Sequence, residues 1–235
     1  MSMNLSRRKF LSNSAKSALV VAASGAIGES VFVNSIASAM AQSAAVQPAF
    51  ARLDEYIARH MRETGAPGMT LALANRDGLI RASTYGFADT KAGLKVENET
   101  MFEIGSVSKS FVGLALVQLQ EEGKLDFHKP VVQYLPWLKI NSKFEAITTH
   151  HLLTHSAGLP AAPLLLDALL QELPVAYAPG KRFLYCNTGY NILGFLIEAL
   201  DKRPFAEAMR ARMLTRLGMM ASAPIISNGI RAQMA

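Results

Sequence analysis

A long apolar stretch with a polar start constrains this chain more than any other feature. The segment Phe111–Val117 is apolar on nearly every side, and Gly123 follows it as a stop signal. This pattern predicts a helix from Ser106 to Glu122. A helix that lacks a polar face is normally buried, so we expect this one to be buried.

The first turn of the predicted helix carries groups that can react. Ser106 and Lys109 are three residues apart and therefore share one face of the helix. A serine hydroxyl becomes a good nucleophile when a neighbouring base takes its proton. A lysine at the start of a buried helix is partly desolvated, which favours the neutral amine that can act as this base. Alone, S-x-x-K also occurs by chance, and Ser106 can be interpreted as a simple N-cap.

A second group of polar side chains follows the Pro179-Gly180 turn. Tyr185 and Asn187 flank Cys186, the single cysteine, which we interpret as a small buried spacer. A tyrosine beside a cationic lysine can have a depressed pKa and take part in proton transfer. Alone, Tyr185 would be interpreted as an ordinary buried tyrosine. Together, the two groups indicate acyl transfer through a covalent acyl-enzyme, with no metal or other cofactor.

These motifs resemble those of the class C β-lactamase-like serine hydrolases, a family of β-lactamases, D,D-peptidases and esterases. The matching segments follow the family's order: Phe102–Phe111, Gly123–Leu135, His151–Pro160, Pro179–Gly194 and Leu217–Met219. The resemblance implies that Ser106 is the acylated nucleophile and that Lys109 and Tyr185 handle its proton. It also implies that Asn187 orients Lys109 and the substrate carbonyl. The histidines of the HLLTHSAGLP segment would be mainly structural.

The backbone N–H of Ser106 is a candidate oxyanion donor. Helix N-termini present unpaired N–H groups and positive dipole character, and such donors stabilise the negative oxygen of an acyl-transfer intermediate. The family's third motif, K-T-G or H-x-G, is not found after Tyr185. In the family, the strand that carries this motif normally supplies the second donor. Because the motif is not found, we expect either a fragment of a longer protein or a truncated gene product, rather than a self-sufficient small variant. Such a chain would be less stable than a full-length relative and nearly inactive.

The resemblance implies an α+β fold, with an antiparallel sheet packed with helices beside a mostly helical region and with the sheet incomplete. Hydrophobic periodicity and turn residues predict the elements in more detail. A helix is expected at 48–63, two strands at 69–75 and 79–85 around an Arg76-Asp77-Gly78 turn, and further helices at about 150–154, 164–173, 190–201 and 205–217.

Residues 1–41 read as an export signal. Ser6–Leu11 forms a twin-arginine pattern, Ala18–Gly28 is too short to span a membrane, and Ala39–Ala41 is an A-x-A cleavage site. We therefore expect a periplasmic or secreted protein whose hydrolase-like domain covers 42–235, with no stable membrane anchor after cleavage. An uncleaved anchor is the alternative.

The charge and the histidines exclude two classes of partner. The leader supplies +3 of the formal net charge of +6, and the remainder is too small to indicate nucleic-acid binding. The histidines do not form an H-E-x-x-H or other metal-binding set. The expected partner is a small-molecule ester, a β-lactam or a peptidoglycan-like D-amino-acid peptide.

Two functions follow from these patterns. The first is a serine hydrolase that acts through an acyl-enzyme, as the intact Ser106, Lys109, Tyr185 and Asn187 indicate. The alternative is a truncated non-catalytic pseudoenzyme, or a protein that binds peptidoglycan-like ligands without turnover. The absence of the family's third motif after Tyr185 favours the alternative.

The twin arginines lead to the first testable prediction. Replacing Arg7 and Arg8 together by lysine should leave the precursor in the cytoplasm, because the pair is read as an address. Mass spectrometry of the exported wild-type protein should find Gln42 at the N-terminus. An exported protein that still carries both arginines would contradict the assignment.

Overall fold

The computed structural model describes residues 28–160, 173–231 and 234–235, and the chain divides after Ala66 into two units. In the first unit, helix α2 runs from Gly28 to Thr64. It contains the helix predicted at 48–63 and begins well before it. Most of the predicted leader lies outside the described residues, and its cleavage stays a prediction. In the described part of the chain, no helix is long and apolar enough to cross a membrane.

The second unit begins with an antiparallel sheet in the order β1-β2-β3. Strand β1 (Gly68–Asn75) pairs with β2 (Gly78–Asp89), and β2 pairs with the short β3 (Leu94–Lys95). Both predicted strands are confirmed; β2 is longer than expected and β3 was not expected. The side chain of Asn75 closes the turn by accepting the N–H groups of Asp77 and Gly78, at 2.8 and 3.1 Å.

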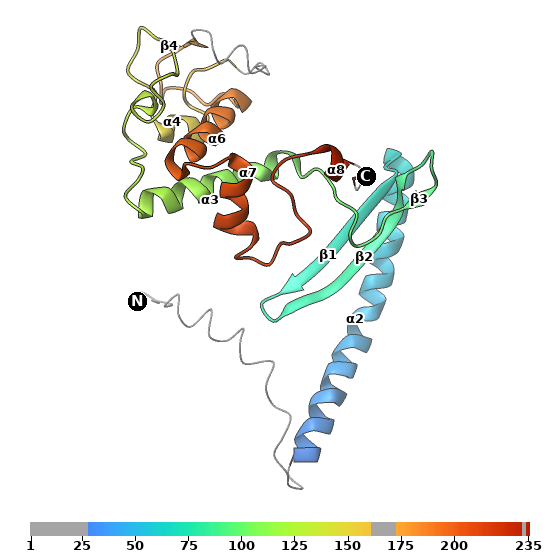
Figure 1. Cartoon of the computed structure of the whole chain (residues 1–235). Helices are drawn as coiled ribbons and strands as arrows, with labels where there is room; N and C mark the ends of the chain where they lie inside the picture. The colour runs from blue at the N-terminus through green and yellow to red at the C-terminus, as the bar shows by residue number, and fades with distance from the viewer. Residues whose placement is uncertain (1–27, 161–172, 232–233) are drawn as a thin grey trace. The chain divides into compact units, whose positions relative to one another are not determined.

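The rest of this unit is mostly helical (Figure 1). Its α-helices are α3 (Ser108–Glu121), α4 (Thr149–Leu153), α6 (Asn187–Asp201), α7 (Phe205–Met209) and α8 (Asn228–Arg231). Short 3₁₀ turns occupy Gly105–Val107 and Val131–Gln133. The helix predicted at 164–173 lies outside the described residues, except for its last residue, which belongs to a strand. That strand, β5 (Leu173–Pro174), pairs in parallel with β4 (Ile140–Asn141).

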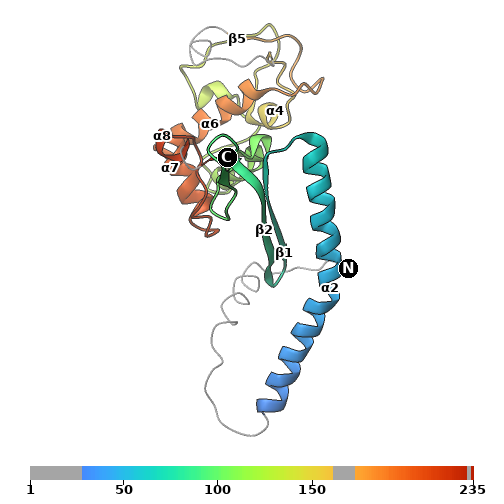
Figure 2. The ribbon, with the colours of Figure 1, turned by 90° about the vertical axis from the view of Figure 1, so that its right-hand side faces the viewer.

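The hydrophobic core lies between the helices. Helix α3 packs against α6 and α7, and α4 packs against α6; Figures 1 and 2 show α4 beside α6 from two directions. Aliphatic side chains of α3 and α6 interlock there and are fully or almost fully buried: Val112, Ala115, Leu116, Leu119, Ile192, Leu193, Leu196 and Ile197.

The prediction that the apolar helix is buried is only partly right. Its α-helical part begins at Ser108, after a 3₁₀ turn, and one of its faces is open: Leu114 is 48% and Val117 42% exposed. Apolar strand residues are also exposed: Leu79, Ile80, Phe87 and Leu94. The apolar side chains of α3 are therefore buried only on the side that faces α6 and α7. The sheet likewise leaves several of its apolar side chains uncovered.

A cluster of one arginine and two carboxylates links the C-terminal ends of α3 and α6. After α7 the chain forms a π-helix, Arg210–Leu214, which the predicted single helix at 205–217 did not foresee. Its wider turn carries Arg212, which is 7% exposed. The guanidinium makes paired bonds to Asp201, the last residue of α6, at 2.6 and 2.5 Å. It also makes paired bonds to Glu122, the C-cap of α3, at 2.8 and 3.1 Å.

This arginine determines the ionisation of both carboxyl groups. Hydrogen bonds from Arg212, and then from Lys124, lower the pKa of Glu122 from 4.5 to about 2. Hydrogen bonding to Arg212 also lowers the pKa of Asp201, whose side chain is only 1% exposed, and the two carboxylates raise the pKa of the arginine. Because Arg212 makes a forked pair of hydrogen bonds with each carboxylate, it stabilises the contact between α3 and α6.

We therefore predict that Arg212→Met destabilises the fold by about 3–5 kcal/mol, since it removes the two short hydrogen bonds of the buried Asp201 carboxylate and leaves it only the more distant Arg203 and Lys124, at 3.8 and 4.0 Å. The matched control is Arg203→Met. Arg203 also faces Asp201, at 3.8 Å, but its side chain is 42% exposed, so its loss should cost no more than about 1 kcal/mol. Chemical denaturation measures both, and equal effects would contradict the assignment.

The ion pairs of Arg212 with Glu122 and Asp201 should also make the stability of the fold depend on pH. Both carboxyl groups have lowered pKa values in the folded state, so their contribution is present above their ordinary pKa values. It is lost as the pH falls through about 4.5 toward 2, because the unfolded chain then binds more protons. Arg212→Met should lose less stability across this window than the wild-type protein.

Candidate active site

The turn before α3 places Ser106 and Lys109 together. Gly105 has a φ of +50°, in the left-handed region that favours glycine, and it starts the 3₁₀ turn that contains Ser106. Lys109 follows in the first turn of α3. Its Nζ lies 3.2 Å from Ser106 Oγ and donates a hydrogen bond to it. The predicted contact between these two residues, three positions apart, is present.

The second pair of predicted residues meets the first across the contact between α3 and α6. Tyr185 lies in an extended segment before α6, and its hydroxyl is 2.5 Å from Ser106 Oγ. Asn187 is the first residue of α6 and accepts a hydrogen bond of 2.9 Å from Lys109 Nζ. Lys109 thus joins the serine to the amide, and all four predicted site residues lie together.

The site is open to solvent on one side. Ser106 and Asn187 are exposed, Lys109 is half-buried, and Tyr185 is 41% exposed. The alternative that Tyr185 is an ordinary buried tyrosine is therefore wrong. Hydrogen bonding with Lys109, and then with Ser106, lowers the pKa of its phenol. A phenol with a lowered pKa, in contact with the serine oxygen, can accept the proton of that serine at a lower pH than an ordinary tyrosine.

Two aromatic residues that were not predicted to belong to the site, Tyr190 and His155, lie around Lys109 and Tyr185. Lys109 Nζ lies 4.8 Å from the ring centre of Tyr185 and 5.3 Å from that of Tyr190. The His155 ring lies 4.5 Å from Tyr185 and 5.1 Å from Tyr190. Tyr190 follows Asn187 by three positions on α6, a spacing that could have identified it. His155, in the HLLTHSAGLP segment, was expected to be mainly structural, and no spacing pattern indicated its contact with Tyr185.

Cys186 has the structural role expected of it. It is 4% exposed, and its Sγ lies 3.2 Å from the carbonyl oxygen of Pro160. Its side chain therefore points away from the exposed residues on either side. Among the described residues, no group of three or more histidine, cysteine, aspartate or glutamate side chains is arranged to hold a metal ion.

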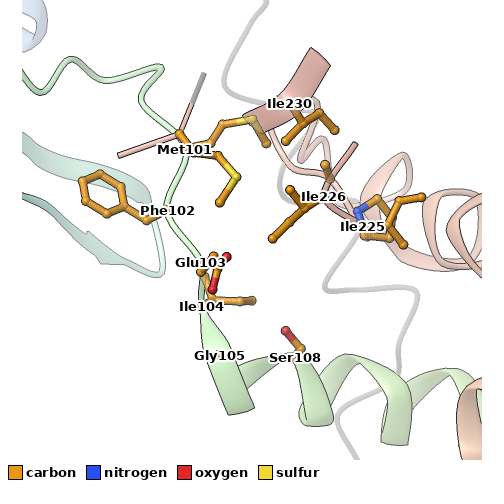
Figure 3. A pocket seen from close by; sticks show the side chains of 12 residues that line it. Met101, Phe102, Glu103, Ile104, Gly105, Ser108, Ile225, Ile226 and Ile230 are labelled. Carbon is orange, nitrogen blue, oxygen red and sulfur yellow. The ribbon is translucent and has the colours of Figure 1, made fainter. Parts of the chain in front are cut away.

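A cavity of about 250 Å³ lies beside the start of α3 and is lined in part by Gly105 and Ser108. Figure 3 shows the Ser108 hydroxyl directed into it from the start of α3, with Ile225 and Ile226 opposite. None of the four site residues lines this cavity. Ser108 is two residues after Ser106 and therefore points to a different side of the helix. The cavity is thus separate from the side on which Ser106, Lys109 and Tyr185 meet.

Comparison with known proteins agrees with this geometry. Residues 53–223 match the family model described as Beta-lactamase, which covers most of the chain. The chain belongs to the β-lactamase family.

Two curated relatives and one solved structure illustrate the range of similar proteins. A β-lactamase from Providencia stuartii is 32% identical over 174 residues, covering 71% of this chain and 45% of the relative. Esterase EstB from Burkholderia gladioli is 29% identical over 196 residues, covering 72% of this chain and 50% of the relative. A class C β-lactamase structure superposes with a TM-score of 0.68 at 27% identity, covering 77% of this chain and 52% of that one.

These comparisons confirm the fold class. The chain has the α+β fold of β-lactamases and penicillin-binding proteins, with an incomplete sheet. It spans half or less of the length of the two curated relatives.

The contacts around Ser106 lead to a prediction about how the two basic groups act. Lys109→Ala and Tyr185→Phe should each slow acylation of Ser106 on the order of 10²–10⁴-fold, the range typical of proton-transfer groups. Because both side chains contact one serine oxygen, the double variant should be little slower than the slower single variant. Acylation rates measured by intact-protein mass spectrometry test this. Full additivity of the two losses would mean that the groups act in different steps.

Proposed function

We propose that this protein is a serine hydrolase that forms a covalent acyl-enzyme at Ser106. The observation that carries the proposal is the contact of Ser106 Oγ with both the Tyr185 hydroxyl and Lys109 Nζ. A serine held between two proton-handling groups is the arrangement that nucleophilic catalysis requires. Membership of a family that includes β-lactamases and esterases supports the same reaction class.

The reaction then proceeds in two halves. Tyr185, with Lys109 beside it, accepts the Ser106 proton as Oγ bonds to the substrate carbonyl carbon, and the carbonyl oxygen becomes negative. The backbone N–H of Ser106 is the proposed donor to that oxygen. Collapse of the intermediate breaks the bond to the leaving group, which takes the proton from Tyr185. In the second half, a water molecule gives a proton to Tyr185 and its oxygen bonds to the acyl carbon. The bond from that carbon to Ser106 Oγ then breaks, Oγ takes the proton back from Tyr185, and the carboxylic acid is released.

Asn187 has a supporting role in this proposal. Its side-chain oxygen accepts a hydrogen bond from Lys109, which leaves the amide NH₂ group available to the substrate carbonyl. The substrates proposed are esters, β-lactams or D-amino-acid peptides, and a nucleic acid is not among them. The twin-arginine pattern and the A-x-A site support action in the periplasm or outside the cell.

A ligand-binding protein without turnover is the second candidate. The open side of the site favours it, because Ser106 and Asn187 are exposed and water-excluded donors contribute most to acyl transfer. A protein of this kind would hold peptidoglycan-like ligands reversibly and would form no adduct.

Covalent labelling separates the two candidates. A fluorophosphonate, and a labelled penicillin in parallel, should each add one label to Ser106, identified by peptide mass spectrometry. Ser106→Ala should abolish the label. Ser108→Ala is the matched control and should keep it, because Ser108 faces the separate cavity. Labelling that survives Ser106→Ala would overturn the proposal, and reversible binding of a penicillin without an adduct would favour the second candidate.

A further inference from the structure

His155 has an unusual backbone conformation for its residue type. It follows α4, whose C-cap is Thr154, and has a φ of +56°. Helices commonly end in this left-handed region, but the residue there is usually glycine or asparagine, since a side chain is strained in it. Such strain persists where surrounding contacts require the side chain, and it is concentrated at functional sites.

The contacts of His155 show what its side chain and backbone hold. Its Nδ1 accepts the backbone N–H of Cys186 at 3.0 Å, and its carbonyl oxygen accepts the backbone N–H of Leu184 at 2.8 Å. These two N–H groups belong to the residues on either side of Tyr185. The segment from 182 to 186 has no regular secondary structure, so bonds from one residue to both flanks restrict how Tyr185 can move.

The ring of His155 also packs directly on the phenol. It lies 4.5 Å from the Tyr185 ring, while Phe183 meets its edge at 5.7 Å and Tyr190 lies on it at 5.1 Å. Burial, and then the positive charge of Lys109, lower the pKa of the imidazole. Near neutral pH the ring is therefore uncharged, and Nδ1 is available as an acceptor for the Cys186 N–H.

We propose that His155 is a positioning residue, which holds the Tyr185 hydroxyl on Ser106 through its bonds to the backbone N–H groups of Leu184 and Cys186, the two neighbours of Tyr185. This inference rests on the proposed function, in which Tyr185 takes the serine proton. His155 contacts the segment around Tyr185 and acts on Ser106 through the tyrosine. The side chain of His155 contributes one acceptor, Nδ1, to the Cys186 N–H. The backbone at this position has a positive φ, which few residue types with a side chain tolerate.

Three substitutions separate the acceptor from the ring. His155→Asn places the amide oxygen at the same position along the side chain as Nδ1 and tolerates positive φ, so it keeps the acceptor and removes the ring. His155→Phe keeps a ring and removes the acceptor, and His155→Ala removes both. His128→Ala is the matched control, because His128 is exposed and its ring pairs with His150, 5.4 Å away.

The first measurement is the rate at which a fluorophosphonate labels Ser106. A misplaced reacting group can slow a reaction up to about a hundredfold, so we expect a loss of about ten- to a hundredfold in the Phe and Ala variants. The Asn variant should stay within a few-fold of wild type, and His128→Ala should be unchanged. An Asn variant as slow as the Ala variant would overturn the role of Nδ1.

The second measurement does not depend on turnover. The ionisation of Tyr185 is followed by tyrosinate absorbance, as the difference between each protein and its Tyr185→Phe counterpart. The contacts that lower this pKa depend on the position of the phenol, so the Phe and Ala variants should shift it upward and the Asn variant should not. If wild type is not labelled at all, the proposed function fails, while an upward shift would still support the positioning role. An unshifted pKa in the folded Phe variant would overturn that role, and thermal unfolding identifies any variant that does not fold.

Discussion

The arginine between the two main helices is the interaction on which the site geometry depends. Arg212 is bonded to the last residue of α6 and to the C-cap of α3, so it ties the C-terminal ends of these helices together. Positive charge is favoured at helix C-termini, and here one cation serves two of them. Burial makes the pairing with Asp201 strict, because a carboxylate that is 1% exposed is costly without its partner, whereas Glu122 is 41% exposed and depends less on the arginine.

The reactive groups lie at the opposite ends of the same helices. Ser106 and Lys109 belong to the start of α3, and Asn187 is the first residue of α6. The aliphatic side chains between the two helices set their spacing, and the arginine opposes sliding of one along the other. A bond of 2.9 Å between Lys109 and Asn187 requires both constraints, since side chains on separate helices meet only when helix spacing and register are fixed together.

Local sequence and long-range geometry contributed differently to what could be predicted. The contact of Lys109 with Ser106 and the turn at Arg76–Asp77 depend on neighbours within a few residues, so spacing and turn chemistry predicted both. The meeting of Tyr185 with Ser106 spans a long stretch of chain, and only the resemblance to a family predicted it. Arg212 was not foreseen, because its burial depends on a π-helical turn, which has no simple sequence pattern. The open face of α3 was missed because the apolar pattern cannot show which neighbours cover a helix.

Backbone strain marks both ends of this helical pair. In the described part of the chain, two non-glycine residues have positive φ: His155 and Lys202. Lys202 is the C-cap of α6, next to Asp201, and its N–H bonds to the carbonyl of Glu198 at 2.8 Å. His155 holds the segment around Tyr185 at the other end. A left-handed conformation costs roughly 1–2 kcal/mol for a residue with a side chain. At Lys202 the αL conformation ends the helix beside the buried carboxylate, and glycine could serve this backbone role. At His155 glycine would relieve the same strain but remove the acceptor for Cys186, so the two positions share a conformation while only one of them requires its side chain.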